Sequence, residues 1–133
     1  MELAKVTVER LIEAARRAQA QAYAPYSNFP VGAAVLGADG RVFPGCNVEN
    51  SSFGLTVCAE RNAVAAAIVA GTRPTAVAVV VNGKPVPPCG ACRQVLAEFE
   101  PSLPVVLASS TESRQEATTL DALLPGAFHF QKP

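Results

Sequence analysis

The stretch Thr56-Val57-Cys58-Ala59-Glu60-Arg61 is separated by Asn62 alone from the apolar run of residues 63–70. Thr56 is a favourable N-cap, so the stretch predicts the first turn of a helix. The N-terminus of a helix carries partial positive charge, which favours the thiolate form of Cys58. Cysteines are also often buried as small apolar side chains, and for this stretch taken alone that interpretation stays open.

A second cysteine-containing stretch, Pro87-Pro88-Cys89-Gly90-Ala91-Cys92-Arg93-Gln94, also predicts the start of a helix. Cys89 and Cys92 are three residues apart, so on a helix they share one face and can bind one metal ion. A lone C-x-x-C fits either a metal site or redox chemistry. Cys58 at another helix start favours zinc, bound by three thiolates with a fourth position open to water. Such an open position is typical of catalytic zinc sites.

Together these motifs resemble the short, zinc-dependent cytidine deaminases that act on nucleosides. The resemblance rests on C-A-E at residues 58–60 and P-C-G-A-C-R-Q at residues 88–94. It extends through P-Y-S-N-F-P-V-G-A-A, N-V-E-N-S-S-F and L-L-P-G-A-F, and covers about residues 26–128. A glutamate that lies beside the metal ligands without being one is part of the zinc-deaminase signature.

Length and composition limit the classes of protein. The 133 residues predict one domain spanning residues 1–133. Eleven Lys and Arg balance eleven Asp and Glu, and this zero net charge weighs against a nucleic-acid partner. The longest apolar run, residues 63–70, is too short to span a bilayer, so no membrane partner is expected. The N-terminal residues show no signal-peptide pattern, and we expect a cytoplasmic protein.

The order of predicted elements indicates an α/β fold. Periodic apolar residues from Val8 to Ala22 predict a first helix capped by Thr7. Apolar runs predict strands at residues 31–36, 41–48, 75–82 and 105–107. A short helix is predicted at residues 120–124, whereas residues 109–119 fit no pattern. This order predicts a three-layer α/β/α sandwich, and the resemblance implies a five-stranded mixed sheet.

Asn47 and Glu49 would point to the same side of the second predicted strand. Asn and Glu are also common where a strand ends in a polar turn, and the interpretation that these two residues only form such a turn stays open. Their amide and carboxylate groups can also bind sugar hydroxyls. The resemblance implies that they hold the ribose, and hence that the substrate is a nucleoside rather than a free base.

The resemblance implies hydrolytic deamination of cytidine, deoxycytidine or both to uridine or deoxyuridine, a reaction of pyrimidine salvage that releases ammonia. Cys58, Cys89 and Cys92 would bind one Zn²⁺ per subunit, which lowers the pKa of a bound water. Glu60 would carry protons between this water, the base and the leaving ammonia.

Further site residues follow from charge or from the resemblance. Arg61 and Gln94 could donate hydrogen bonds to the thiolates and offset their excess negative charge, although Arg61 could also be an exposed helix arginine. The resemblance implies substrate contacts for Ala59, and walls for the pyrimidine ring from Phe29 and Phe128. Phenylalanines are more often core residues. Phe128 would belong to the site of a neighbouring subunit, which implies a homotetramer.

Two alternatives stay open. One is a structural zinc module without activity, in which Cys46 closes a four-cysteine site; it would leave Glu60 and Arg61 without a role. The other is a related deaminase that acts on a cytosine-containing nucleoside antibiotic or on a polynucleotide, and zero net charge weighs against the polynucleotide. His129, the sole histidine, is interpreted as a partly exposed C-terminal residue.

Overall fold

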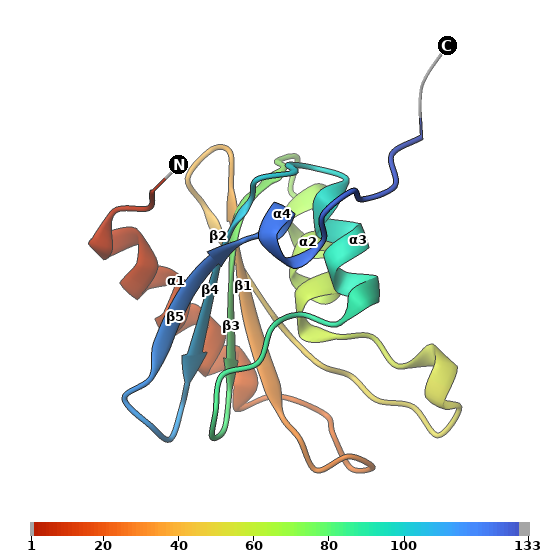
Figure 1. The fold of residues 1–133 in the computed structure, drawn as a ribbon. Helices are drawn as coiled ribbons and strands as arrows, with labels where there is room; N and C mark the ends of the chain where they lie inside the picture. Colours follow the sequence, from red (N-terminus) through yellow and green to blue (C-terminus); the bar gives the residue numbers. More distant parts are fainter. Residues whose placement is uncertain (1, 131–133) are drawn as a thin grey trace.

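A computed structural model describes residues 2–130 of the chain (Figure 1). The predicted domain of residues 1–133 therefore has residues 1 and 131–133 outside the described range. Within that range every helix is too short or too polar to cross a lipid bilayer. In chain order the elements are α1 (Lys5–Gln19), β1 (Val31–Gly37), β2 (Val42–Cys46), a 3-10 helix η1 (Phe53–Leu55), α2 (Ala59–Val69), β3 (Pro74–Val81), α3 (Gly90–Ala97), β4 (Pro104–Ser109), β5 (Gln115–Thr119) and α4 (Leu120–Leu123).

The strands form one five-stranded mixed sheet in the order β2-β1-β3-β4-β5. β1 pairs antiparallel with β2 and β3, β3 pairs parallel with β4, and β4 pairs antiparallel with β5. α1 covers one face of the sheet, and α2, α3 and α4 lie on the other (Figure 1). The predicted three-layer α/β/α sandwich with a five-stranded mixed sheet is confirmed.

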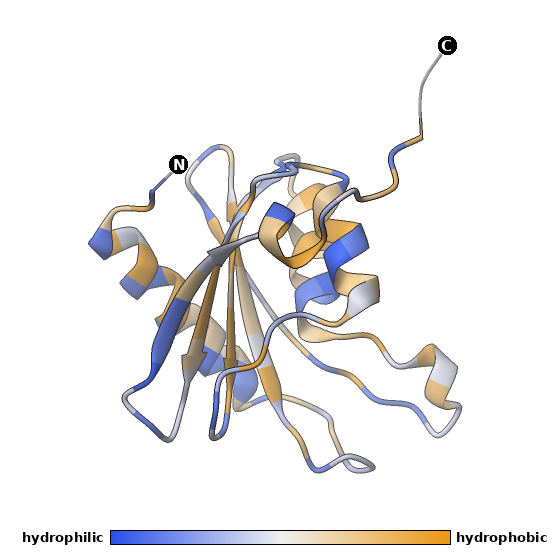
Figure 2. Ribbon diagram, viewed as in Figure 1, coloured by the Kyte–Doolittle hydropathy of each residue, from blue (hydrophilic) through white to orange (hydrophobic). Residues whose placement is uncertain are grey.

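The central strand β3 is buried on both faces, which explains its continuous apolar sequence. Its residues alternate between two apolar clusters. Val77, Val79 and Val81 pack on the side of α2 and α3, and Ala76, Ala78 and Val80 pack on the side of α1. Figure 2 shows hydrophobic residues concentrated in the inner strands of the sheet.

Two predicted helix caps are wrong by two or three residues. α1 begins at Lys5 after Ala4, so Thr7 lies inside the helix rather than at its cap. α2 begins at Ala59 with Cys58 at the N-cap, so Thr56 does not cap it. The hydroxyl of Thr56 instead accepts a hydrogen bond from the main-chain N–H of Asn50 at 3.2 Å.

The second strand is shorter than predicted. β2 ends at Cys46, so Asn47 and Glu49 lie beyond it rather than on it. The segment still pairs locally, because Val48 forms isolated bridges with Tyr23 and Val57. These bridges join the loop before β1 to the segment that leads into α2. The fifth strand, β5, lies in residues 109–119, where the sequence showed no pattern.

The packing of α1 on β1 depends on Gly32. A Cβ atom added at Gly32 would lie 1.8 Å from the carbonyl oxygen of Ala15 and 2.6 Å from the main-chain nitrogen of Gln19. Both are main-chain atoms of α1, so the helix itself would have to move. We expect Gly32→Ala to lower the free energy of unfolding by about 3 kcal/mol, measured by urea denaturation.

Gly54 is a matched control, because a Cβ atom there meets nothing within 4 Å. Gly54→Ala should change the free energy of unfolding by less than about 0.5 kcal/mol. Equal stability of the Gly32→Ala and Gly54→Ala variants would contradict the close packing of α1.

Candidate active site

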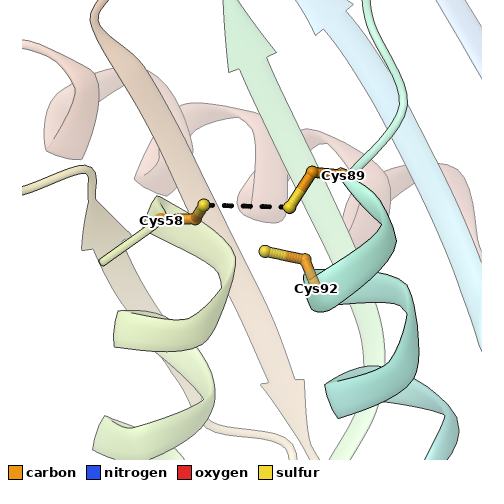
Figure 3. Close-up of side chains that lie close together, drawn as sticks. All are labelled: Cys58, Cys89 and Cys92. Atoms are coloured by element: carbon orange, nitrogen blue, oxygen red, sulfur yellow. Dashed lines mark hydrogen bonds between the residues drawn. The ribbon is translucent and has the colours of Figure 1, made fainter. Parts of the chain in front are cut away.

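Cys58, Cys89 and Cys92 come together at the starts of α2 and α3 (Figure 3). Their sulfur atoms all lie within 4.8 Å of one another, and the Sγ atoms of Cys58 and Cys89 are 3.9 Å apart. Tetrahedral zinc with Zn–S bonds of about 2.3 Å holds its sulfur ligands roughly 3.8 Å apart. The three predicted ligands therefore fit one zinc ion.

The helix starts direct these sulfur atoms toward one another. Cys58 and Cys89 occupy the N-cap positions of α2 and α3, and neither side chain makes a capping hydrogen bond. A serine or aspartate at an N-cap would turn its oxygen toward the first helical N–H groups. Cys92 lies in the first turn of α3 and is buried. Two helix N-termini thus lie next to the cluster, and their partial positive charge favours thiolates.

Hydrogen bonds lower the pKa of the Cys58 thiol. The neighbouring thiol of Cys92 is the largest cause, and together with Arg61 it lowers the pKa of Cys58 to about 5. The Cys58 thiolate in turn raises the pKa of Cys92. Arg61 donates from Nη2 to the Sγ atom of Cys58 at 3.6 Å, as the sequence predicted. Arg61 is therefore a structural part of the site rather than an exposed helix residue.

Gln94 does not have the predicted position. Its Nε2 donates to the main-chain oxygen of Phe128 at 2.8 Å instead of to a thiolate. The residue before it, Arg93, was missed by the sequence reasoning. Arg93 donates to the main-chain oxygens of Pro88 at 2.8 Å and Leu123 at 2.7 Å. The hydrogen bonds of Arg93 and Gln94 thus connect α3, which carries Cys92, to α4 and to the C-terminal segment.

Glu60 lies in the first turn of α2, and only 4% of its surface is exposed. Burial is the main cause that raises the pKa of Glu60 to about 7, and the Cys58 thiolate adds to this effect. Both protonation states of the carboxyl are therefore populated near neutral pH. A group of this kind can accept a proton and release it again.

Glu60 and the cysteine cluster share a cavity of about 320 Å³ with the predicted sugar and base contacts. Of the three cysteines of the cluster, Cys58 and Cys89 line this cavity. The other lining residues are Ser27, Phe29, Val31, Asn47, Glu49, Thr56, Val79, Val86 and Pro87. The cavity brings polar groups and apolar walls next to the cluster, as ligand sites generally do.

Asn47 and Glu49 form hydrogen bonds with the loop before β1. The sequence did not indicate these contacts. Asn47 is buried; its Nδ2 donates to the main-chain oxygen of Phe29 at 3.0 Å, and its Oδ1 accepts from the N–H of Val31 at 2.9 Å. The Oε1 atom of Glu49 accepts from the N–H groups of Tyr26 at 3.0 Å and Ser27 at 3.1 Å. The hydrogen bond from the Ser27 hydroxyl is the largest cause that lowers the pKa of Glu49.

Several predicted residues lie outside this cavity. Ala59 is fully buried at the start of α2, and Phe128 is 71% exposed in the C-terminal segment. Their predicted substrate contacts remain predictions. His129 is exposed, as interpreted. Cys46 is not part of the cysteine cluster, and it lines a groove together with residues of α1 such as Ala14.

Comparison with known proteins agrees with this arrangement. The family described as "Cytidine and deoxycytidylate deaminase zinc-binding region" matches residues 5–108. A cytidine deaminase of Sporosarcina psychrophila is 52% identical over 124 residues, which cover 91% of this chain and 90% of that protein. The crystal structure of cytidine deaminase from Burkholderia pseudomallei is 53% identical, with a TM-score of 0.85, covering 90% of this chain and 98% of that one. The crystal structure of cytidine deaminase from Mycobacterium tuberculosis is 44% identical, with a TM-score of 0.76, and covers 92% of this chain and 98% of that one. This chain therefore belongs to the cytidine and deoxycytidylate deaminase family of enzymes.

Proposed function

We propose that this enzyme hydrolyses cytidine, deoxycytidine or both to uridine or deoxyuridine and ammonia, as in pyrimidine salvage. The observation that carries the proposal is the shared cavity, in which the cysteine cluster and buried Glu60 lie beside Asn47 and Glu49. The cysteine cluster and Glu60 are suited to chemistry on a base, whereas Asn47 and Glu49 are suited to binding a sugar. The relatives named cytidine deaminases support the same substrate class.

Cys58, Cys89 and Cys92 would hold one Zn²⁺ per subunit. Zinc with three protein ligands supplies hydroxide near neutral pH, because it lowers the pKa of a bound water. Three thiolates exceed the charge of a divalent ion by one. The Arg61 guanidinium, which hydrogen-bonds to Cys58, offsets part of that excess.

Glu60 would perform the proton transfers. Its carboxylate accepts a proton from water, the protonated form donates to N3 of the cytosine ring, and a further transfer goes to the leaving amine. The water oxygen ends on C4 as the C4–N bond breaks, so one water is consumed and one ammonia is released. A pKa of about 7 suits a group that must act first as base and then as acid.

The charge of the cavity supports an unphosphorylated substrate. Its acidic lining residues are Glu49 and Glu60, and within residues 2–130 no Lys, Arg or His lines it. A phosphate on the sugar would approach the Glu49 carboxylate without a cation to bind it. We therefore favour nucleosides over deoxycytidylate, and the zero net charge of the chain disfavours a polynucleotide.

Exposed apolar side chains near the cavity support assembly into a homotetramer whose neighbouring subunits complete each site. The rings of Tyr26 and Phe53 pair edge to face at 5.7 Å, and both are largely exposed. Phe128 and Phe130 are also exposed, in the C-terminal segment. Adjacent exposed aromatic side chains such as Tyr26 and Phe53 are typical of surfaces that a partner covers.

The state of the cysteines supports a cytoplasmic location. All four are free thiols, and three of them lie close enough together to be oxidised if the compartment were oxidising. Reducing compartments keep such thiols available for a metal.

The decisive experiment is the change in ultraviolet absorbance when the zinc-loaded enzyme is mixed with cytidine, deoxycytidine, cytosine or deoxycytidylate. We expect turnover of at least one nucleoside, with cytosine and deoxycytidylate far slower. Faster turnover of deoxycytidylate than of either nucleoside would contradict the proposal. Activity confined to a cytosine-containing nucleoside antibiotic would favour the related deaminase instead.

Cys46→Ala tests the number of zinc ligands. Cys46 lines the groove beside α1 and lies outside the sulfur cluster. We expect unchanged zinc content and turnover, and a loss of about 1 kcal/mol in the free energy of unfolding from reduced packing. Cys92→Ala is the matched comparison and should lose the metal. A drop in zinc stoichiometry for folded Cys46→Ala would contradict the three-thiolate site.

A further inference from the structure

Ser27 lies between the carboxylate of Glu49 and the loop that precedes β1. Its hydroxyl donates to the Oε2 atom of Glu49 and accepts from the main-chain N–H of Phe29 at 3.0 Å. Its own N–H donates to the Oε1 atom of Glu49 at 3.1 Å. Ser27 therefore hydrogen-bonds to both oxygens of the Glu49 carboxylate and also to the main-chain N–H of Phe29.

The hydrogen bonds leave one oxygen of Glu49 available. A carboxylate has about four acceptor positions, two on each oxygen. Oε1 accepts the N–H groups of Tyr26 and Ser27, so both of its positions are used. Within the part of the chain that the structure describes, Oε2 accepts only the Ser27 hydroxyl, so one position on Oε2 remains. The hydroxyl of Ser27 thus holds the one oxygen that can still bind a ligand.

Glu49 lines two neighbouring cavities. The first is the cavity beside the cysteine cluster, and the second, of about 310 Å³, is lined by Tyr26, Ser27, Glu49, Phe53 and Thr56. Ser27, Glu49 and Thr56 line both, so the two cavities adjoin at these residues. A Glu49 side chain released from Ser27 could turn its free oxygen toward either cavity. Its orientation decides whether that oxygen faces the substrate.

We propose that Ser27 is a positioning residue for Glu49: its hydroxyl holds the Oε2 atom where it accepts a hydrogen bond from the substrate's sugar. The inference rests on the proposed nucleoside deamination. The proposed role of Ser27 depends on its contact with Glu49, so removal of the hydroxyl should affect substrates that carry the sugar more than it affects the free base. A loop residue with a purely structural role would affect nucleoside and free base alike.

The test is a double-mutant cycle of Ser27→Ala and Glu49→Ala, with kcat/KM measured for cytidine and for cytosine. We expect Ser27→Ala to lower kcat/KM for cytidine about tenfold, the effect of losing one hydrogen bond to a charged group, and to lower kcat/KM for cytosine much less, through the contact with Phe29. In the Glu49→Ala background the same substitution should lower kcat/KM for cytidine no more than for cytosine. Ser27→Thr keeps the hydroxyl and should restore most of the activity.

Ser113→Ala is the matched control, because this exposed serine lines neither cavity. Thermal unfolding and zinc content accompany each measurement, and Ser27→Gly replaces Ser27→Ala if the latter does not fold. Equal losses on cytidine and cytosine, or an undiminished loss in the Glu49→Ala background, would overturn the inference. A wild-type enzyme that turns over no nucleoside would instead refute the proposed function itself.

Discussion

Glu60→Gln is expected to keep the fold and the zinc while lowering kcat for cytidine by about a thousandfold or more. The amide has nearly the same shape as the carboxyl but cannot accept and return a proton. The substitution should cost little stability, because burial already raises the pKa of Glu60 to about 7 and a neutral group fits its surroundings. The measurement is single-substrate kinetics together with zinc content by atomic absorption.

Glu98→Gln provides the control, since Glu98 is exposed at the end of α3 and lines no part of the cavity. This variant should retain the wild-type kcat. Substantial deamination by zinc-loaded Glu60→Gln would contradict the proposed role of Glu60. Loss of zinc from the same variant would instead indicate that Glu60 helps to hold the metal.

The buried elements could be predicted from the sequence, and the polar edge strand could not. β3 and β4 are buried on both faces, so their apolar runs stand out in the sequence. β5, with the sequence Q-E-A-T-T, is mostly exposed and pairs only with β4. Figure 2 shows its hydrophilic character. Charged and polar edge strands avoid pairing with other chains, and for that reason they lack an apolar pattern.

The cluster of Cys58, Cys89 and Cys92 could be predicted for a different reason. Binding of a single ion restricts the ligands to a few residue types, and the C-x-x-C spacing on a helix shows that two of them share a face. The surroundings of the cluster carry no such signal. Arg93 contacts Leu123, 30 residues away, and Ser27 contacts Glu49, 22 residues away. Contacts of this kind depend on how loops cross in the folded chain, so spacing in the sequence does not reveal them.

Glu49→Ala is expected to lower kcat/KM for cytidine about a hundredfold and to change the already slow reaction of cytosine little. Binding energy from a part of the substrate that does not react can position the part that does, so losing the sugar contact should exceed the loss of one hydrogen bond. Glu49 lines the same cavity as Glu60, so a sugar bound by Glu49 would lie beside a base that reacts at Glu60.

The structure adds a second role for this carboxylate, because Glu49 also accepts hydrogen bonds from the N–H groups of Tyr26 and Ser27. Glu49→Gln separates the two roles, since its amide oxygen can still accept both N–H groups while the negative charge is lost. A loop defect would slow cytidine and cytosine equally in Glu49→Ala and would be relieved in Glu49→Gln. If Glu49 contacts the sugar, only kcat/KM for cytidine should fall, and the ratio of kcat/KM for cytidine to that for cytosine should fall with it. A wild-type ratio near one would refute the assignment of Glu49 to the sugar.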